Sequence, residues 1–457
     1  MKSLAILGLA LVSLSQAQSL RPSLTTTAIV GARIQVSPTQ VIEKGSVLMR
    51  GGRIIAVGES VVVPPGAIVT DGKGLTVYAG FIDAFTTKGL GSVKLPRHTD
   101  VPSISEDVVT QMRVAYPEQT GLGAAQLYDP DNDQWKNLRA GGFTAALVAP
   151  SGSFINGPAA VFNTSGKAGA SALLQDRTAL FADIFGPGSR YGGEYPGTAL
   201  GRYAGLRQAL LDSNWMAEAS QADSGERPAQ DPFIGSLANS ISQGMPLVFS
   251  AGDISNIQHT IRLAKELGAP ALLVDAGQGY KNPGILKGAS VILKLAFGKE
   301  PIPTAVQPPG GAAKPAEAAP VPENPDEDPL PIKQDAERNF VDLVRNPSVL
   351  AKQGIPFAFS ADGVPGTDEF FKNLRRAVKE GLSQEDAIAG LTTNAASLLK
   401  LKGLGRIEAG AIANLTVWNG SLFDDKSSAA FVYIDGIKLD PKKKRLGAPL
   451  QFDFDEE

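Results

Sequence analysis

The chain of 457 residues has no cysteine and only two histidines, His98 and His259. Without cysteine, disulfide bonds, thiolate metal sites, iron–sulfur clusters and cysteine nucleophiles are excluded. Two histidines also exclude any site built on three imidazoles, a common way to hold catalytic zinc. Charged residues make up 19% of the chain, below the usual ~25%.

Neither sign of charge predominates. The chain has 43 basic and 46 acidic residues, for a formal net charge of −3. A protein that holds nucleic acid non-specifically needs a basic field to neutralise phosphates, and this composition provides none. We therefore expect no nucleic-acid partner.

The N-terminus has the pattern of a secretory signal peptide. Lys2 precedes an apolar run at residues 4–14, and Ser15 and Ala17 are small residues at the positions that a signal peptidase reads. The alternative is an uncleaved anchor, which the short run disfavours. We predict that residues 1–17 are removed and that the protein is exported to the periplasm, the cell envelope or the medium. No later segment is long and apolar enough to make it an integral membrane protein.

The two ends of the chain are rich in strand signals. Alternating and β-branched segments surround the turns Gly51-Gly52 and Asp71-Gly72, and this predicts a meander of short antiparallel strands. Near the C-terminus, residues 412–418 and 431–439 are also β-rich, and the second segment folds back at Asp435-Gly436. We predict one small β-sandwich built from residues 24–76 and 404–440.

Between these ends, short apolar strands alternate with amphipathic helices such as residues 254–267 and 370–379. The predicted strands are residues 77–82, 144–148, 247–250, 271–274, 291–295 and 357–360. Repeated strand–helix units favour a parallel sheet, and their number over residues 77–403 makes a (β/α)8 TIM barrel the predicted α/β fold. The segment 149–158, with Asn156-Gly157-Pro158, is expected as a loop at the functional end of that barrel; the alternative is a simple turn.

Two segments lack the composition of a packed core. Residues 299–333 are dense in Pro, Ala, Gly and Glu, and we predict a disordered surface insertion; the alternative is a lid or partner-binding arm. Residues 441–457 form a charged tail.

Five segments together resemble the amidohydrolase superfamily, in particular its secreted imidazolonepropionase-like members. They read S-V-L-M-R-G-G-R-I-I-A-V-G, G-L-T-V-Y-A-G-F-I-D-A-F-T-T, G-I-P-F-A-F-S-A-D-G, G-L-S-Q-E-D-A-I-A-G-L-T-T-N-A-A-S-L-L-K-L and G-R-I-E-A-G-A-I-A-N-L-T-V-W. The resemblance covers the whole chain after the signal peptide. It implies a TIM barrel with a composite β-sandwich, and metal-dependent hydrolysis of non-peptide carbon–nitrogen bonds, often in cyclic amides.

The resemblance also implies metal ligands that this chain lacks. The family begins its site with two histidines in a D-A-H-T-H pattern, and here Phe85 and Thr87 stand in their places. Two later histidine positions are matched by Ser250 and Asp275. Only the aspartate after the last barrel strand is kept, as Asp362. A phenyl ring cannot coordinate zinc, so we expect no metal cofactor.

Each remaining polar residue has a functional and a structural interpretation. Asp362 is the candidate catalytic base, or it only caps a turn. Asp275 joins Asp362 in a hard-cation site, or it only accepts hydrogen bonds. His98 lies in a loop that reaches the barrel mouth, or it is an ordinary exposed histidine. His259 falls on the polar face of its helix and is expected to face solvent. Neither histidine is placed to activate Ser250, which disfavours a serine triad.

Whether the chain is an enzyme stays open at this point. The first hypothesis is a metal-free pseudoenzyme, exported, that binds a small-molecule ligand or an envelope protein or serves as a scaffold. The alternative is an active hydrolase with a carboxylate site at Asp83, Asp275 and Asp362. A third is a homo-oligomer that completes its site across an interface.

Overall fold

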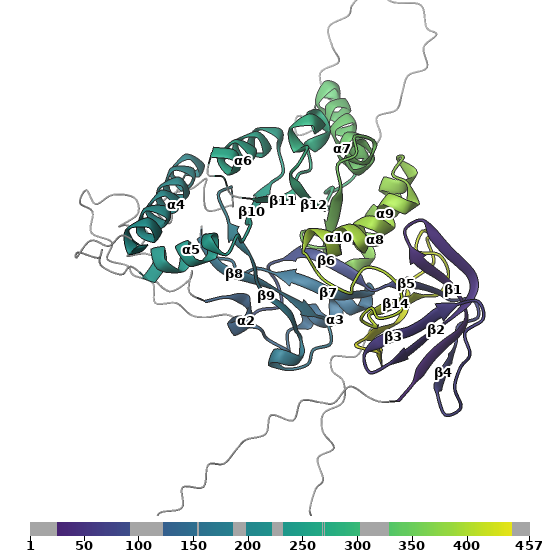
Figure 1. Cartoon of the computed structure of the whole chain (residues 1–457). Helices are drawn as coiled ribbons and strands as arrows, with labels where there is room; N and C mark the ends of the chain where they lie inside the picture. Colours follow the sequence, from purple (N-terminus) through teal and green to yellow (C-terminus); the bar gives the residue numbers. More distant parts are fainter. Residues whose placement is uncertain are drawn as a thin grey trace, which may run out of the picture.

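Two eight-stranded sheets form the framework of the structure (Figure 1). The computed structural model describes residues 25–91, 122–152, 155–185, 198–221, 232–266, 268, 270–301 and 329–440. The predicted signal peptide, His98, most of the predicted insertion and the charged tail lie outside these ranges.

The first sheet combines strands from both ends of the chain. Its strands are β1 (Thr27–Ser37), β2 (Gln40–Arg50), β3 (Arg53–Gly58), β4 (Ile68–Asp71), β5 (Thr76–Ala79), β14 (Leu415–Trp418), β15 (Ala429–Ile434) and β16 (Ile437–Leu439). The order is β16-β15-β14-β5-β1-β2-β3, with β4 also pairing to β1. The chain ends thus meet where β14 pairs with β5.

Most local predictions for this sheet are confirmed, and one is wrong. Gly51 and Gly52 have positive φ in the β2–β3 hairpin, and Asp435 and Gly436 do so between β15 and β16. Both are two-residue turns of the kind the sequence indicated. However, the meander is not purely antiparallel, because β4 and β5 pair in parallel with β1. The connection between β3 and β4 returns the chain so that β4 runs in the same direction as β1.

The second sheet runs in the order β13-β12-β11-β10-β9-β8-β7-β6. Its strands are β6 (Phe81–Thr86), β7 (Phe143–Val148), β8 (Ile155–Asn163), β9 (Leu173–Ala182), β10 (Leu247–Ala251), β11 (Ala271–Asp275), β12 (Ser290–Lys294) and β13 (Phe357–Ser360). Seven strands run the same way, and β8 is antiparallel to both of its neighbours. The structure therefore has an α/β fold that departs from eight strictly repeated strand–helix units.

The segment around Asn156 corrects the sequence prediction. Asn156 was expected in a loop, but it lies in β8, is 1% exposed and donates a hydrogen bond to the carbonyl of Phe181. The antiparallel strands β7, β8 and β9 follow one another here, where alternating strand–helix units were expected. Glycine and proline suggested a turn, but burial of the surrounding apolar residues favours a strand with register irregularities at Pro158.

Helices cover the second sheet on its outer side and connect it to the first (Figure 1). They are α2 (Ala124–Leu127), α3 (Asp133–Ala140), α4 (Ala199–Gln221), α5 (Pro232–Ser242), α6 (Ile254–Glu266), α7 (Leu330–Lys352), α8 (Thr367–Lys379), α9 (Gln384–Leu391) and α10 (Thr393–Leu398), with short 3-10 turns at Gly169–Ser171, Gly279–Lys281 and Pro283–Leu286. None of the described helices has the length and apolar composition that a membrane crossing needs.

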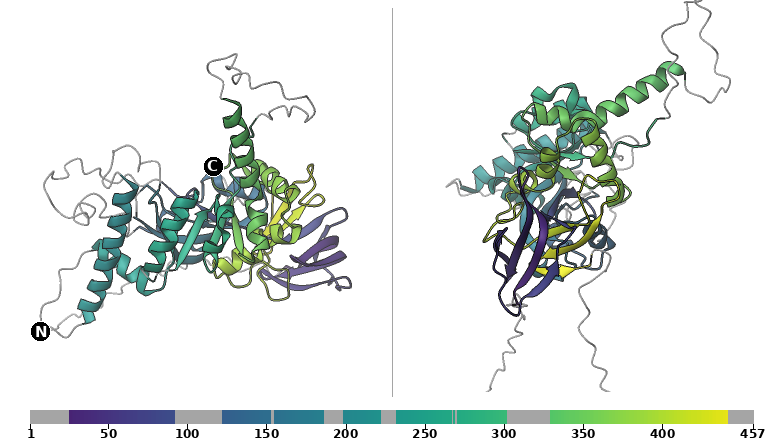
Figure 2. Two further views of the ribbon diagram at one scale, coloured as in Figure 1. Left: turned by 90° about the horizontal axis from the view of Figure 1, so that it is seen from above. Right: turned by 90° about the vertical axis from the view of Figure 1, so that its right-hand side faces the viewer.

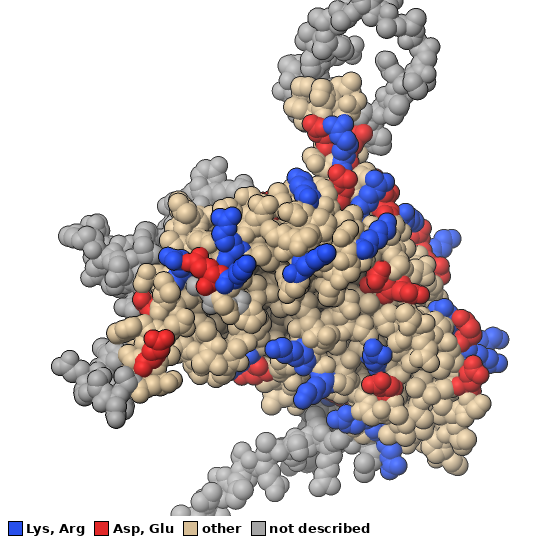
Figure 3. Space-filling view, turned by 45° about the horizontal axis from the view of Figure 1, so that its top comes forward, with Lys and Arg blue, Asp and Glu red and all other residues tan. Residues whose placement is uncertain are grey.

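Helix α7 begins inside the segment predicted as a disordered insertion. Residues 330–333 are already helical, while residues 302–328 lie outside the description. The first turns of α7 project from the body of the molecule (Figure 2). On this projection Asp335 and Arg338 form an ion pair, and Figure 3 shows acidic and basic side chains alternating along it.

Both faces of the second sheet are buried. Along β7, Ala146 and Val148 join one apolar cluster, and Ala145 and Leu147 join another. This period of two explains why the strands read as continuous apolar runs: neither face meets water. Such a sheet places its polar residues at the strand ends.

Candidate functional site

The carboxyl ends of five parallel strands bring together the residues that the resemblance singled out. Ala251 pairs with Asp275 across β10 and β11, Asp275 pairs with Leu293 of β12, and Lys294 pairs with Ser360 of β13. The end of β6 reaches the same edge, because the Ser360 hydroxyl donates a 2.5 Å hydrogen bond to the Phe85 carbonyl. In parallel α/β sheets, ligands bind at this edge.

Asp83 joins the two end strands of the sheet. Its side chain is fully buried, and Oδ1 accepts hydrogen bonds from the backbone N–H groups of Ala361 at 3.1 Å and Phe85 at 3.4 Å. Oδ2 has no hydrogen-bond partner within the described part of the chain. Burial raises the pKa of Asp83 to about 7; the two backbone bonds oppose the rise, the nearby charge of Asp362 adds to it, and Lys294 opposes it.

Asp362 forms an ion pair with Lys294. The Lys294 Nζ lies 2.9 Å from Asp362 Oδ2, and the two side chains are only 17% and 14% exposed. The Asp362 N–H donates to the Ser360 hydroxyl, which fixes the turn after β13. Asp362 therefore lies at the strand ends, in an ion pair with Lys294, and takes part in the local structure of the turn after β13.

Asp275 has a strained backbone at the end of β11. Its φ is +84°, in the left-handed region where a residue other than glycine costs roughly 1–3 kcal/mol. A Cβ on Gly252 would lie 2.6 Å from Asp275 Oδ2, so the carboxylate occupies space that only glycine leaves. Burial raises the pKa of Asp275; the charge of Lys294 opposes this, and the charges of Asp253 and Asp362 add to it.

The neutral residues at the positions where the resemblance implies metal ligands differ in their surroundings. Phe85 is 1% exposed, and its ring packs edge-on against Phe181 with 5.2 Å between centroids. Thr87 and Ser250 are half-buried. His259 is exposed on α6, as its helical position predicted.

Lys294 and Ser360 are the residues that sequence reasoning missed. Lys294 is the only charged residue within the apolar stretch 289–297. A charge at the end of an apolar strand indicates that the side chain has a partner there, because buried charges are paired. Ser360 gave no signal, because a serine at a strand end is common. Its hydrogen bond to the Phe85 carbonyl, 275 positions away in the sequence, depends on the tertiary fold.

The donors at these strand ends do not suit a divalent metal. Within the described residues, no three histidine, cysteine, aspartate or glutamate side chains come close enough together to hold one. The Lys294 ammonium lies against Asp362, and the ring of Phe85 lies 5.9 Å from the same ammonium. A cation at Asp362 Oδ2 would have to displace this ammonium.

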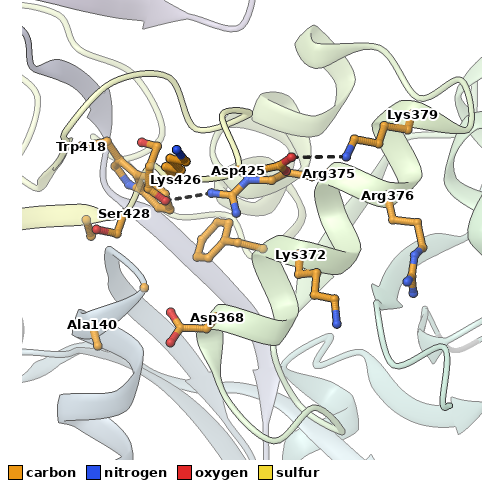
Figure 4. A pocket seen from close by; sticks show the side chains of 14 residues that line it. Ala140, Asp368, Lys372, Arg375, Arg376, Lys379, Trp418, Asp425, Lys426 and Ser428 are labelled. Carbon is orange, nitrogen blue, oxygen red and sulfur yellow. Dashed lines mark hydrogen bonds and ion pairs between the residues drawn. The ribbon is translucent and has the colours of Figure 1, made fainter. Parts of the chain in front are cut away.

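A second candidate is a surface groove of about 630 Å3 beside α8 (Figure 4). Its basic side chains are largely engaged. Arg375 donates to the carbonyls of Leu422 and Ser427, and Lys379 lies 3.5 Å from Asp425. Burial lowers the pKa of Arg375. This groove anchors the β14–β15 loop on α8, and its chemistry is that of a structural contact.

The sequence model described as "Amidohydrolase family" matches residues 309–438. No curated protein matches the sequence. Among solved structures, the chain is similar to an amidohydrolase from Thermotoga maritima MSB8, with 22% identity and a TM-score of 0.70 over 90% of this chain and 99% of that one.

Two further structures show weaker similarity. One is a Xaa-Pro dipeptidase with methionine bound in its active site, at 17% identity and a TM-score of 0.52 over 91% of this chain and 100% of that one. The other is an amidohydrolase, at 17% identity and a TM-score of 0.51 over 91% of this chain and 99% of that one. The chain therefore has the fold of solved amidohydrolases, and its C-terminal part matches the amidohydrolase family.

Proposed function

We propose that this protein is an exported amidohydrolase relative that works without a metal and binds a ligand or partner instead of hydrolysing carbon–nitrogen bonds. The observation that supports this most directly is the environment of Phe85. Its buried ring, packed on Phe181, fills the place where the resemblance puts the first metal-binding histidine. A filled apolar position is not one that a metal-loaded state can use.

The finer features of the proposal rest on the sequence resemblance. The row of eight strands, with β6 and β13 joined through Asp83 and Ser360, supports a barrel of (β/α)8 origin in which β8 is reversed. Export rests on the pattern of residues 1–17. The partner we propose is a small molecule at the strand ends or a protein of the cell envelope, with a homo-oligomer as a further form.

One observation favours the alternative, an active carboxylate-based hydrolase. Asp83 and Asp275 both have raised pKa values, while Asp362 is paired with a lysine. A metal-free hydrolase can use one protonated carboxyl group as its general acid and one ionised carboxylate as its general base. We rank this second, because Asp83 is fully buried and cannot reach a substrate as the chain stands.

The variant Asp362→Asn separates the two functions. We expect no turnover of cyclic amides or dipeptides by the wild type in the presence of a chelator, and the same result for the variant. Ligand binding by the wild type, followed by its thermal shift against a small-molecule collection, should be detectable under the same conditions. Chelator-resistant turnover that Asp362→Asn abolishes, with Asp335→Asn on α7 as the matched surface control, would replace the binding function by the hydrolase.

A further inference from the structure

Lys294 lies at the end of β12, next to β11, which carries Asp275, and next to β13, which is followed by Asp362. Its ammonium contacts Asp362 at 2.9 Å and has a favourable electrostatic interaction with Asp83 and with Asp275. The pair is 17% and 14% exposed, so water screens it poorly. The carboxylates come from β6, β11 and the turn after β13, and the lysine from β12 between them.

The charged forms of Asp83 and Asp275 are disfavoured at this place, and a nearby cation favours them. Asp362 interacts unfavourably with both Asp83 and Asp275, and burial disfavours the charged form of each of these two groups. In the family that the chain resembles, a divalent metal supplies positive charge at this edge. Here the described donors do not suit such a metal, and within the described residues Lys294 is a positive charge that interacts with all three carboxylates.

We propose that Lys294 is the built-in cation of this centre: its ammonium takes the electrostatic place of a metal ion and holds the ends of β6, β11, β12 and β13 together. This inference rests on the proposed function in that it takes the centre to be metal-free. Lys294 is a positioning residue, since it acts through the carboxylates that it neutralises.

The geometry distinguishes Lys294 from an ordinary surface pair. Lys379 and Asp425 also form a lysine–aspartate pair, but at 3.5 Å and with both side chains at least 70% exposed (Figure 4). An exposed pair of that kind contributes little to stability. A half-buried ammonium that faces several carboxylates leaves uncompensated charge behind when it is removed. Lys379 therefore offers a matched control.

Chemical rescue tests the proposal. Lys294→Ala removes a fragment equivalent to n-propylammonium and should lower Tm by several degrees, whereas Lys379→Ala should shift Tm by less than about 1 °C. Adding n-propylammonium chloride at about 100 mM should restore at least half of the Tm lost in Lys294→Ala. Equal concentrations of sodium chloride, which changes only the ionic strength, or of n-propanol, which has a similar size without the charge, should not restore the Tm.

Two results with the lysine variants would contradict the proposal. An unchanged Tm in Lys294→Ala, or a response to n-propylammonium no larger than in Lys379→Ala, would overturn the proposal. If Lys294→Ala does not fold, the double variant Lys294→Met/Asp362→Asn replaces it: it should be more stable than Lys294→Met alone, and an equal or lower Tm would count against the proposal. A wild type that holds stoichiometric metal would instead refute the proposed function, and the metal assay reports this separately from the rescue.

Discussion

Asp83 shows how a single residue combines structural and electrostatic roles. In the sequence, Asp83 precedes Phe85, where the resemblance implies the first histidine. In the structure, Asp83 accepts a hydrogen bond from Ala361, which lies 278 positions away. No local pattern predicts a hydrogen bond between residues that far apart. The raised pKa follows from that burial, so it also could not be predicted before the fold was known.

The raised pKa of Asp83 predicts how stability depends on pH. An unfolded aspartate has a pKa of about 3.9, and in the fold the value is about 7. Between these values the folded state binds more protons than the unfolded state, so the free energy of unfolding falls as pH rises from about 4 to about 7. Asp275, whose pKa is also raised, contributes in the same direction.

The variant Asp83→Asn should flatten this dependence, because an amide keeps the acceptor oxygen and cannot ionise. Urea unfolding at pH 5, 6, 7 and 8 would measure it, with the variant expected to be at least as stable as the wild type at pH 8. The exposed Asp335→Asn serves as the control and should keep the wild-type slope. A wild-type slope that survives unchanged in Asp83→Asn would refute the assignment.

At the scale of elements, the positions of the strands along the chain were predicted better than the sheet that each strand joins. Five of the predicted central strands correspond to β7, β10, β11, β12 and β13, because apolar runs between turn signals mark buried strands directly. The segment 77–82 was read as one strand, but Gly80 divides it into β5 of the first sheet and β6 of the second. Which sheet a strand joins depends on contacts that its own sequence does not encode.

Gly80 allows the close approach at this division. A Cβ on Gly80 would lie 2.1 Å from Thr144 Oγ1 and 2.9 Å from Thr144 Cβ. Gly80→Ala should therefore destabilise the fold by about 1–3 kcal/mol through overpacking.

Gly235→Ala is the matched control for Gly80→Ala. It lies in α5 with nothing within 4 Å of the added Cβ, and it should be neutral or stabilising by about 0.5–1 kcal/mol. Denaturant unfolding of the two variants measures both effects. Equal stabilities would show that the junction between the sheets tolerates a side chain and that the division at Gly80 has another cause.

At the scale of the whole molecule, the joining of the two chain ends was predictable and the centre was only partly so. Strand-rich composition at both ends and the family resemblance together predicted one β-domain from both chain ends; the pairing of β14 with β5, which was assigned to the barrel, was not predicted. The missing histidines were visible at once in the sequence. The role proposed for Lys294 was not visible in the sequence, because it depends on the contact with Asp362, which lies 68 positions away.

Bound metal, measured by mass spectrometry, tests the central claim most directly. The protein lacking residues 1–17 would be purified without chelators and then equilibrated with zinc, manganese and magnesium before removal of free ions. We predict far less than one ion per chain, because Phe85 fills the first ligand position and Lys294 supplies the positive charge. One or more tightly held ions per chain would contradict the account and make Asp275 and Asp362 the first ligands to examine.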